Sequence, residues 1–470
     1  MHLILGFGAT GASYLRYLNK RNIPALIMDS RHHPPGLSEF TSLNKENLFL
    51  GGFNQEILDR VETILVSPGI PYDNEILLEA RKLNKKIATD IEIFLKESKS
   101  RNILVTGTNG KTTAVSMMTH ALKGTFQDEK IISCGNIGIP VLDTLEEEND
   151  ISVIEVSSFQ LEHSDPDNLE CDIACLLNVS EDHLDRHVSL EEYKEIKEKV
   201  FYNSKISILG EEYHGKYHLN QLSKKILFWW RGWTEGTKWL QESHNVSLLE
   251  EIYKDHHKFP FNKHLYTVMA VILSVAILRN KRKVDQGINT LDQSEEFLER
   301  QLDFLEEELD LSDLWLKTAK ILNSFELPEH RFEYLGIRNG VHFINDSKAT
   351  NIHSMLAAID EVKNRYGKNT TILICGGDSK NQDISKLTKE NLKSIKKILI
   401  YGVDKKIIKE NIHTNADCLL VNDLEEAVDK AKSCSIEGDV VLLSPFCAST
   451  DMFLDYRERG HKFRELSGFN

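Results

Sequence analysis

Short apolar runs alternate with segments of helical spacing over residues 1–95. Apolar stretches at residues 3–5, 25–28 and 64–66 each end in a glycine or a polar residue, and residues 14–22 between the first two carry apolar side chains at helical intervals. Runs of this length are typical of buried strands, and the intervening period is that of helices. The alternation predicts a parallel sheet with helices on its faces.

The same pattern returns twice further along the chain. Strand-like runs occur near residues 103–105, 151–154 and 173–177, and again near 341–344, 372–375, 398–401 and 440–443. The sequence shows no repeat of fixed period, and no low-complexity linker lies between the three groups of strand-like runs. The pattern predicts an α/β protein of three tandem units at residues 1–95, 96–326 and 327–470, which agrees with a length too great for one hydrophobic core.

The signal weakens between residues 211 and 325. Residues 225–233 hold three of the five tryptophans. They favour an aromatic-rich strand in a core over a platform for stacked bases. Leu298, Leu302, Leu305 and Leu309 share one helical face opposite acidic residues, which predicts an amphipathic helix packed on the domain; a helix that docks a partner stays open. Residues 267–278 predict a buried helix, too short to cross a bilayer.

The charge of the chain limits its partners. A net charge of −15 disfavours nucleic acid, which needs a basic surface, but it permits small anions held at helix N-termini. The N-terminus lacks the features of a signal peptide, and no span for a membrane is expected. The seven cysteines contain no CxxC pair, so we expect the reduced thiols of a cytoplasmic protein and no zinc site.

Two glycine-containing loops follow predicted strands. Residues 6–11 (GFGATG) with Asp29 match the dinucleotide pattern, in which glycines let the backbone approach a pyrophosphate. This pattern alone does not tell whether the loop binds a nicotinamide cofactor or a UDP-sugar. A tight turn that binds no ligand would show the same pattern. Residues 104–113 (LVTGTNGKTT) resemble a phosphate loop with Val105 at the first glycine position. Gly107 is expected to make the tight turn, with Lys111 at a terminal phosphate and Thr112 at Mg²⁺.

Acidic and basic side chains cluster where other predicted strands end. Glu155 closes an apolar strand and needs a partner if buried, and a carboxylate beside a phosphate loop suits Mg²⁺. Asp182, His183 and Asp185 follow the next strand. In the third unit the strand ends carry His330-Arg331, Asp346, Ser347, Lys348, Thr350, Lys380 and Ser449, which suit a small polar substrate. Ser189 with Glu192 predicts the start of a helix whose lysines 194, 197 and 199 would all be solvated.

Together these motifs resemble the Mur ligases of peptidoglycan synthesis. They are GTNGKTT, GNIGIP, EVSSFQLE, LNVSEDHLDRH, HRFE with INDSKATN, GGDSK and LLSPFCAS, in that order. The last four, with GFGATG, MDSR, SPGI and DIEIF near the N-terminus, are most similar to the D-glutamate-adding members. The likeness covers nearly all of the chain except residues 211–325.

The resemblance implies a fold and a reaction. The fold is a Rossmann-like domain for the UDP moiety, a central P-loop ATPase-like domain and a C-terminal Rossmann-like domain. In the reaction, ATP phosphorylates the carboxylate of UDP-N-acetylmuramoyl-L-alanine, the D-glutamate amine attacks the acyl phosphate, and phosphate leaves. The resemblance also implies two Mg²⁺ ions, a monomer, and no partner beyond these small molecules.

The resemblance further assigns roles to residues. The catalytic group would be Lys111, Glu155, His183 and Lys197, and the metal ligands Thr112, Glu155, His183 and Lys197 as a carbamate. ATP would contact Gly107, Thr108, Asn109, Gly110, Lys111, Thr112, Thr113, Arg331 and Asp346. The UDP substrate would contact Gly8, Thr10, Asp29, Ser30, Arg31, Ser67, Gly69, Ile70, Asn136 and His183. D-glutamate would contact Lys348, Thr350, Lys380, Ser449 and Tyr456.

Some positions depart from the family pattern. Leu265 stands where the family has an asparagine that helps to hold adenine, and Tyr456 replaces a common phenylalanine. Three alternatives are another amino-acid-adding ligase, including the folylpolyglutamate type, a nucleotide-dependent oxidoreductase, and a non-catalytic ATP-binding scaffold. An oxidoreductase would leave Lys111, Glu155 and the third unit unexplained. The presence of Lys111, Glu155 and Lys197 argues against a scaffold.

Overall fold

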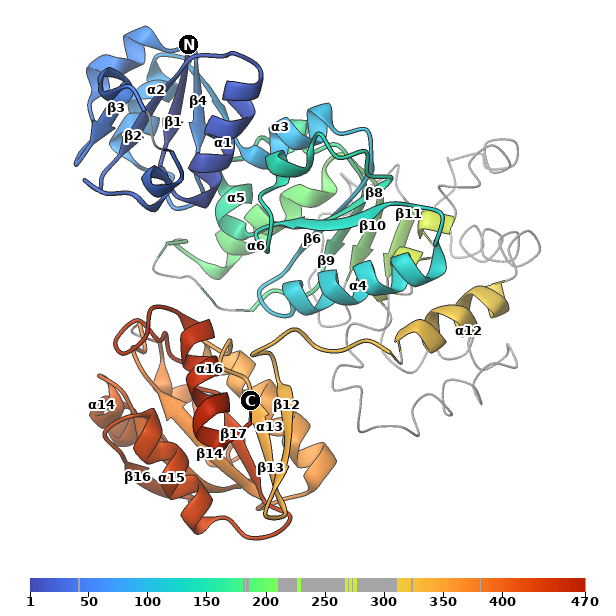
Figure 1. Cartoon of the computed structure of the whole chain (residues 1–470), viewed down its shortest axis with the longest axis vertical. Helices are drawn as coiled ribbons and strands as arrows, with labels where there is room; N and C mark the ends of the chain where they lie inside the picture. Colours follow the sequence, from blue (N-terminus) through green and yellow to red (C-terminus); the bar gives the residue numbers. More distant parts are fainter. Residues whose placement is uncertain are drawn as a thin grey trace. The chain divides into compact units, whose positions relative to one another are not determined.

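The computed structural model describes residues 1–40, 43–180, 182, 186–209, 226–229, 267, 268, 270–272, 274–276, 311–322, 324–380 and 382–469. The described residues form two compact units, one ending at Phe325 and the other beginning at Glu326. Within them the chain builds three α/β sheets in tandem, two in the first unit and one in the second, which confirms the predicted fold class (Figure 1). The exact domain boundaries stay predictions.

The N-terminal sheet is parallel, with strand order β3-β2-β1-β4-β5. Its strands are β1 (His2–Leu5), β2 (Ala25–Asp29), β3 (Leu48–Leu50), β4 (Thr63–Val66) and β5 (Lys86–Ala88), and its helices are α1 (Ala9–Lys20), α2 (Glu75–Lys82) and α3 (Asp90–Glu97). Consecutive side chains Leu3, Ile4 and Leu5 are all fully buried, as expected of a strand covered by helices on both faces.

The second sheet is also parallel, with order β11-β10-β9-β6-β8-β7. Its strands are β6 (Arg101–Thr106), β7 (Ile131–Gly135), β8 (Ile151–Glu155), β9 (Cys171–Leu176), β10 (Ser204–Leu209) and β11 (Ile226–Trp229). The helices are α4 (Lys111–Thr125), α5 (Ser158–His163), α6 (Leu190–Glu198) and α12 (Leu311–Leu322). The chain crosses from one side of β6 to the other between β8 and β9, and such switch points place ligands beyond the carboxyl ends of the strands.

Parts of the stretch 211–325 are described. β11 confirms the predicted strand among the tryptophans. The described residues between 267 and 276 are helical and mostly buried, as predicted. α12 packs against α4, with the side chain of Ile321 beside Gly124. Leu298, Leu302, Leu305, Leu309 and Leu265 lie outside the described residues.

The third sheet has the order β12-β13-β17-β14-β15-β16 and is parallel except for β12, which pairs antiparallel with β13. Its strands are β12 (Glu333–Arg338), β13 (Val341–Asn345), β14 (Thr371–Gly376), β15 (Ile395–Tyr401), β16 (Asp417–Leu420) and β17 (Val440–Leu443), and its helices are α13 (Ile352–Tyr366), α14 (Lys405–Asn411), α15 (Leu424–Cys434) and α16 (Tyr456–Ser467). Every residue of β14 and β17 is buried. None of the helices in the described residues is long and apolar enough to cross a membrane.

Candidate active site

The loop after β6 runs directly into α4. Val105 is a buried residue inside β6 and pairs with Glu155 of β8, so the position of the missing glycine belongs to the strand. Gly107 (φ 156°) opens the turn, and Gly110 (φ 78°) precedes α4 in the left-handed region that favours glycine. The tight turn therefore begins at Gly107, as predicted. Backbone N–H groups in the first turn of a helix are typical binding sites for phosphate.

The segment after β9 holds this loop in place. The N–H of Thr108 donates to the carbonyl oxygen of Asn178 (3.0 Å), and the N–H of Asn109 donates to Asn178 Oδ1 (2.9 Å). The N–H of Ser180 donates to Thr108 Oγ1 (3.0 Å). Asn178 was not among the predicted site residues, although its place at a strand end was a signal.

Lys111 folds back over the loop. Its Nζ donates to the carbonyl oxygens of Gly107 (2.7 Å) and Thr108 (2.8 Å). The ammonium thus lies at the loop and is partly buried, where it can reach a phosphate held at the N-terminus of α4.

Glu155 is buried at the end of β8, and both of its carboxylate oxygens accept a hydrogen bond. Its Oε2 accepts from Thr112 Oγ1 (2.7 Å) and its Oε1 accepts from Asn136 Nδ2 (2.8 Å). Thr112 comes from α4 and Asn136 follows β7, so three elements converge on one carboxylate. Thr113, one residue on, is buried in the first turn of α4.

Lys197 is the buried lysine of α6, with 1% of its surface exposed. Its Nζ donates to the carbonyl oxygen of Gly107 (2.9 Å) and lies 4.5 Å from the centre of the Tyr193 ring. Burial, and secondly the charge of Lys111, holds the pKa of Lys197 well below its usual value, against the opposing effect of Asp182.

The expectation that all three lysines near this helix are solvated was wrong. Lys197 is buried, and Lys199 Nζ donates to the carbonyl oxygens of Leu161, Glu162 and Ser164 at the end of α5. Lys194 instead lies near Glu191 and Glu198 of its own helix. The predicted start is right, because Ser189 caps α6 by accepting from the N–H of Glu192 (3.2 Å). Of the acidic loop before it, Asp182 is described, whereas His183 and Asp185 lie outside the described residues.

The predicted UDP-binding residues other than Asn136 and His183 gather at the carboxyl ends of β1, β2 and β4. Asp29 Oδ2 accepts from the N–H of Phe7 (2.7 Å), and Arg31 Nε donates to Asp29 Oδ1 (2.8 Å). Ser67 Oγ donates to the carbonyl oxygen of Gly6 (2.7 Å). These neighbouring loops also carry Gly8, Thr10, Ser30, Gly69 and Ile70. Asp29 thus supports the first glycine loop and is itself paired with Arg31.

The structure requires a glycine at position 11, in the first turn of α1, but leaves room for a side chain at position 8. A Cβ at Gly11 would lie 2.2 Å from the carbonyl oxygen of Gly6, whereas at Gly8 it would meet no atom within 4 Å. Close packing of α1 on β1 therefore depends on Gly11, as the dinucleotide pattern requires of its third glycine.

The loop at Ile70 is bound by residues that the sequence analysis missed. The carbonyl oxygen of Ile70 accepts from His163 Nε2 (2.7 Å) and Arg186 Nη2 (2.5 Å), and Arg186 Nη2 also donates to Glu162 Oε2 (2.5 Å). Burial lowers the pKa of His163 to about 4, so this ring is neutral at neutral pH. His163 is the last residue of α5, and Arg186 lies between β9 and α6. The hydrophobic core around these elements is continuous with that of the first sheet.

The second unit brings another set of predicted residues to one edge. Asp346, Lys348 and Thr350 follow β13, Lys380 follows β14, and Ser449 follows β17. These strands are adjacent in the sheet, so their carboxyl ends lie side by side. Arg331 precedes β12 in the same unit.

Asp346 is buried beneath this edge. Its carboxylate accepts from Ser444 Oγ (2.8 Å) and from the N–H of Phe332 (3.1 Å). Burial raises the pKa of Asp346 to about 7 despite these hydrogen bonds.

The basic side chains at the same edge of the sheet are more exposed to solvent than Asp346. Lys348 Nζ lies 4.0 Å from the centre of the Tyr456 ring, a cation–π contact. Lys380 is exposed and has a left-handed backbone (φ 49°). Gln382 links the loops, because its Nε2 donates to the carbonyl oxygens of Thr350 (3.2 Å) and Phe446 (2.9 Å).

Arg459 is a residue of the second unit that the sequence did not reveal. It is fully buried on α16, where its Nε donates to Ser347 Oγ (3.0 Å), Nη2 to the carbonyl oxygen of Ser347 (2.8 Å) and Nη1 to that of Cys447 (3.1 Å). It therefore joins the loops after β13 and β17, which carry Asp346 and Ser449.

We expect Arg459→Met to lower the free energy of unfolding by about 3 kcal/mol, since charge-assisted hydrogen bonds to buried acceptors would be lost. Arg457→Met, on the exposed side of the same helix, should change stability by less than about 0.5 kcal/mol. Thermal unfolding of both variants checks this, and equal melting temperatures would contradict it.

Family models match these three units in order. Residues 1–89 match the Mur ligase MurD-like N-terminal domain, residues 105–268 the Mur ligase middle domain, and residues 330–447 the Mur ligase glutamate ligase domain. The chain belongs to the Mur ligase family.

Curated relatives are similar over almost their whole length. A UDP-N-acetylmuramoylalanine--D-glutamate ligase of Shewanella oneidensis is 32% identical over 98% of this chain and 97% of its own. The enzyme of the same name from Caldicellulosiruptor bescii is 31% identical over 98% and 96%.

Solved structures confirm the fold. The UDP-N-acetylmuramate-alanine ligase MurC of Thermotoga maritima aligns with a TM-score of 0.50 at 15% identity, covering 99% of this chain and 98% of its own. MurF ligase of the same organism, in complex with ADP, aligns with 0.52 at 14%, covering 99% and 93%.

Proposed function

We propose that the protein is an ATP-dependent ligase that joins D-glutamate to UDP-N-acetylmuramoyl-L-alanine in the synthesis of peptidoglycan precursors. The observation that carries the proposal is the convergence of Lys111, Thr112, Glu155 and Lys197 on one loop. The names of relatives that match along the whole chain support the choice of substrates. The alternative is a ligase that adds a different amino acid, and experiment must distinguish the two. The monomeric state and the cytoplasmic location stay predictions.

The loop after β6 would bind the phosphates of ATP. Its residues 107–113 supply backbone N–H groups at the start of α4, and Lys111 would neutralise charge as the terminal phosphoryl group moves to the substrate carboxylate. Phosphoryl transfer between two anions depends on alignment and charge neutralisation rather than on a protein nucleophile. Arg331 and Asp346, in the second unit, are each proposed to contact ATP.

The residues present fit a divalent cation. Thr112 Oγ1 and Glu155 Oε2 lie 2.7 Å apart and are oxygen ligands of the kind that Mg²⁺ prefers. When bound, Mg²⁺ would neutralise phosphate charge. Asn136 would orient Glu155 through its bond to Oε1. His183 is proposed at a second Mg²⁺.

Lys197 is proposed to act as a carbamate. Burial lowers the pKa of Lys197 and so favours the neutral amine, the form that attacks CO₂, more than in an exposed lysine. The lone pair of the neutral amine forms a bond to the carbon of CO₂, one C=O electron pair moves onto oxygen, and a proton of the nitrogen passes to solvent, so the neutral side chain becomes an anionic carbamate. An anion suits a site that binds a second cation, whereas an ammonium would repel it.

The second unit would bind D-glutamate. Its two carboxylates need cations and hydroxyls, which Lys348, Lys380, Thr350 and Ser449 supply at adjacent strand ends, beside Tyr456. The N-terminal loops of Gly8, Asp29, Arg31 and Ser67 would bind the uridine diphosphate.

Lys380→Ala should raise the KM for D-glutamate about ten- to a hundredfold, because one charge-assisted contact contributes roughly 1.5–3 kcal/mol. The KM for the UDP substrate should stay unchanged. Lys389→Ala removes another exposed lysine of the same unit and should alter neither value. Steady-state kinetics with each substrate varied in turn decides it, and an unaltered KM for D-glutamate in the Lys380 variant would refute the assignment.

Phosphate release tests the proposed function. We expect release from ATP when UDP-N-acetylmuramoyl-L-alanine and D-glutamate are both present, and little when either is omitted. Release that needs neither substrate would contradict a ligase.

A further inference from the structure

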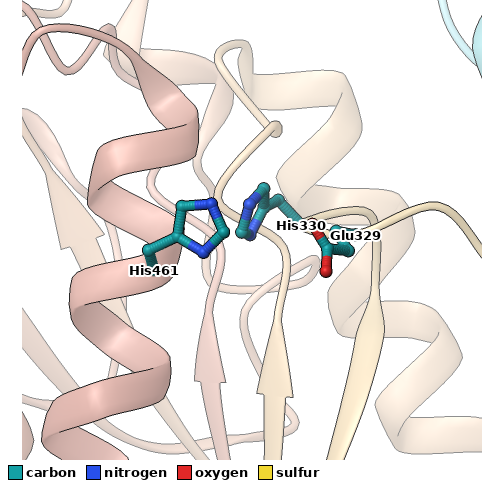
Figure 2. Close-up of side chains that lie close together, drawn as sticks. All are labelled: Glu329, His330 and His461. Carbon is teal, nitrogen blue, oxygen red and sulfur yellow. The ribbon is translucent and has the colours of Figure 1, made fainter. Parts of the chain in front are cut away.

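Glu329, His330 and His461 form a cluster in the second unit, beside the end of β13, where the N–H of Lys348 donates to the carbonyl oxygen of His330 (3.0 Å) (Figure 2). One potential ligand atom of each lies within 4.8 Å of the other two. Glu329 and His330 precede β12, whereas His461 lies on α16. The rings of His330 and His461 are nearly perpendicular, with centroids 4.6 Å apart.

The side chain of His330 is fixed by its neighbours, and one of its ring nitrogens lacks a hydrogen-bond partner among the described residues. Only 3% of the residue is exposed. Its Nδ1 lies 3.0 Å from Asn345 Nδ2, and a Cβ at Gly460 would come within 2.2 Å of it, so this side of the ring is filled. Nε2 is also buried and has no hydrogen-bond partner among the described residues. A buried ring nitrogen without a partner costs free energy. A bound ion would satisfy Nε2 in the tautomer that carries the ring proton on Nδ1, which lies 3.8 Å from Glu333 Oε2.

We propose that Glu329, His330 and His461 bind a divalent transition-metal ion of the zinc class. Two imidazoles and one carboxylate form a ligand set that suits Zn²⁺, with water as a fourth ligand, whereas Mg²⁺ prefers oxygen. Zinc–ligand distances of about 2.0–2.2 Å require the three atoms to draw closer than 4.8 Å. Glu329 and His461 are exposed and can rotate towards the fixed His330.

This site differs from the expectation that the chain holds no zinc. That expectation considered cysteine spacing, and His461 lies far from Glu329-His330 in the sequence. An ion here would tie the segment of Arg331 to α16, two residues from Arg459, and should therefore stabilise the second unit.

Zinc titration of the full-length protein in excess Mg²⁺, against a chelating dye, tests the proposal. His461→Asn and Glu329→Gln should each weaken one Zn²⁺ site at least about tenfold, while His413→Asn, an exposed histidine elsewhere in this unit, should not. Zn²⁺ should raise the melting temperature of the wild type and of His413→Asn more than that of His461→Asn.

Co²⁺ in place of Zn²⁺ reports the ligands directly. The wild type should give the visible absorption of a low-symmetry four-coordinate ion, and His461→Asn should lose it. Absence of binding, equal affinity of the wild type and His461→Asn, or equal loss in His413→Asn would each overturn the proposal. The test uses no turnover, so its result is independent of the ligase reaction.

Discussion

Lys197→Ala should lower kcat at least about 100-fold, and added acetate or formate should partly restore it. The substitution removes both a bond to the carbonyl oxygen of Gly107 and, on the proposed function, the carbamate anion. A small carboxylate can fill the vacated space with a similar pair of oxygens. The measurement is turnover of the variant against carboxylate concentration.

Lys194→Ala is the matched control for this result. Lys194 lies on the same helix with its charge near Glu191 and Glu198, so its loss should leave kcat unchanged. Lys199→Ala is less suitable, because Lys199 caps the end of α5 and its removal should reduce stability. Normal turnover of Lys197→Ala, with no response to carboxylate, would mean that this lysine is structural.

Lys111→Ala should lower ATP-dependent phosphate release at least about 100-fold with little change in melting temperature. Lys111 bonds to two loop carbonyls and is only partly buried, so few packing contacts depend on it. On the proposed function, its positive charge neutralises the terminal phosphate as that group is transferred. Lys123→Ala, an exposed lysine near the end of α4, should behave as wild type. Near-native phosphate release by Lys111→Ala would show that this loop is not the ATP site.

Much of the architecture follows from the apolar pattern. The strands ending at Leu5, Thr106 and Leu443 were visible because each is a buried run closed by a glycine or a polar residue. Since parallel strands of one sheet bring their carboxyl ends to one edge, the sequence also predicts which loops meet. The antiparallel pairing of β12 was not predicted, because apolar alternation does not reveal strand direction.

The rest depends on tertiary contacts. Lys197 has apolar residues at helical spacing on both sides, Tyr193 and Val200, which was a signal for its burial that the prediction did not use. Its burial is completed when α6 packs on the loop at Gly107. Arg459 stands among charged residues in a polar helix, and its burial depends on the loops after β13 and β17, whose Ser347 and Cys447 are 112 and 12 residues away in the sequence. The cluster of His330 and His461 arises for the same reason.

The most direct measurement of the central claim is product mass with a panel of amino acids. With ATP, Mg²⁺ and UDP-N-acetylmuramoyl-L-alanine, mass spectrometry should show one new amide with D-glutamate. It should show little with L-glutamate, L-lysine, meso-diaminopimelate or folate-type substrates. Preferential product with any of these in place of D-glutamate would contradict the account.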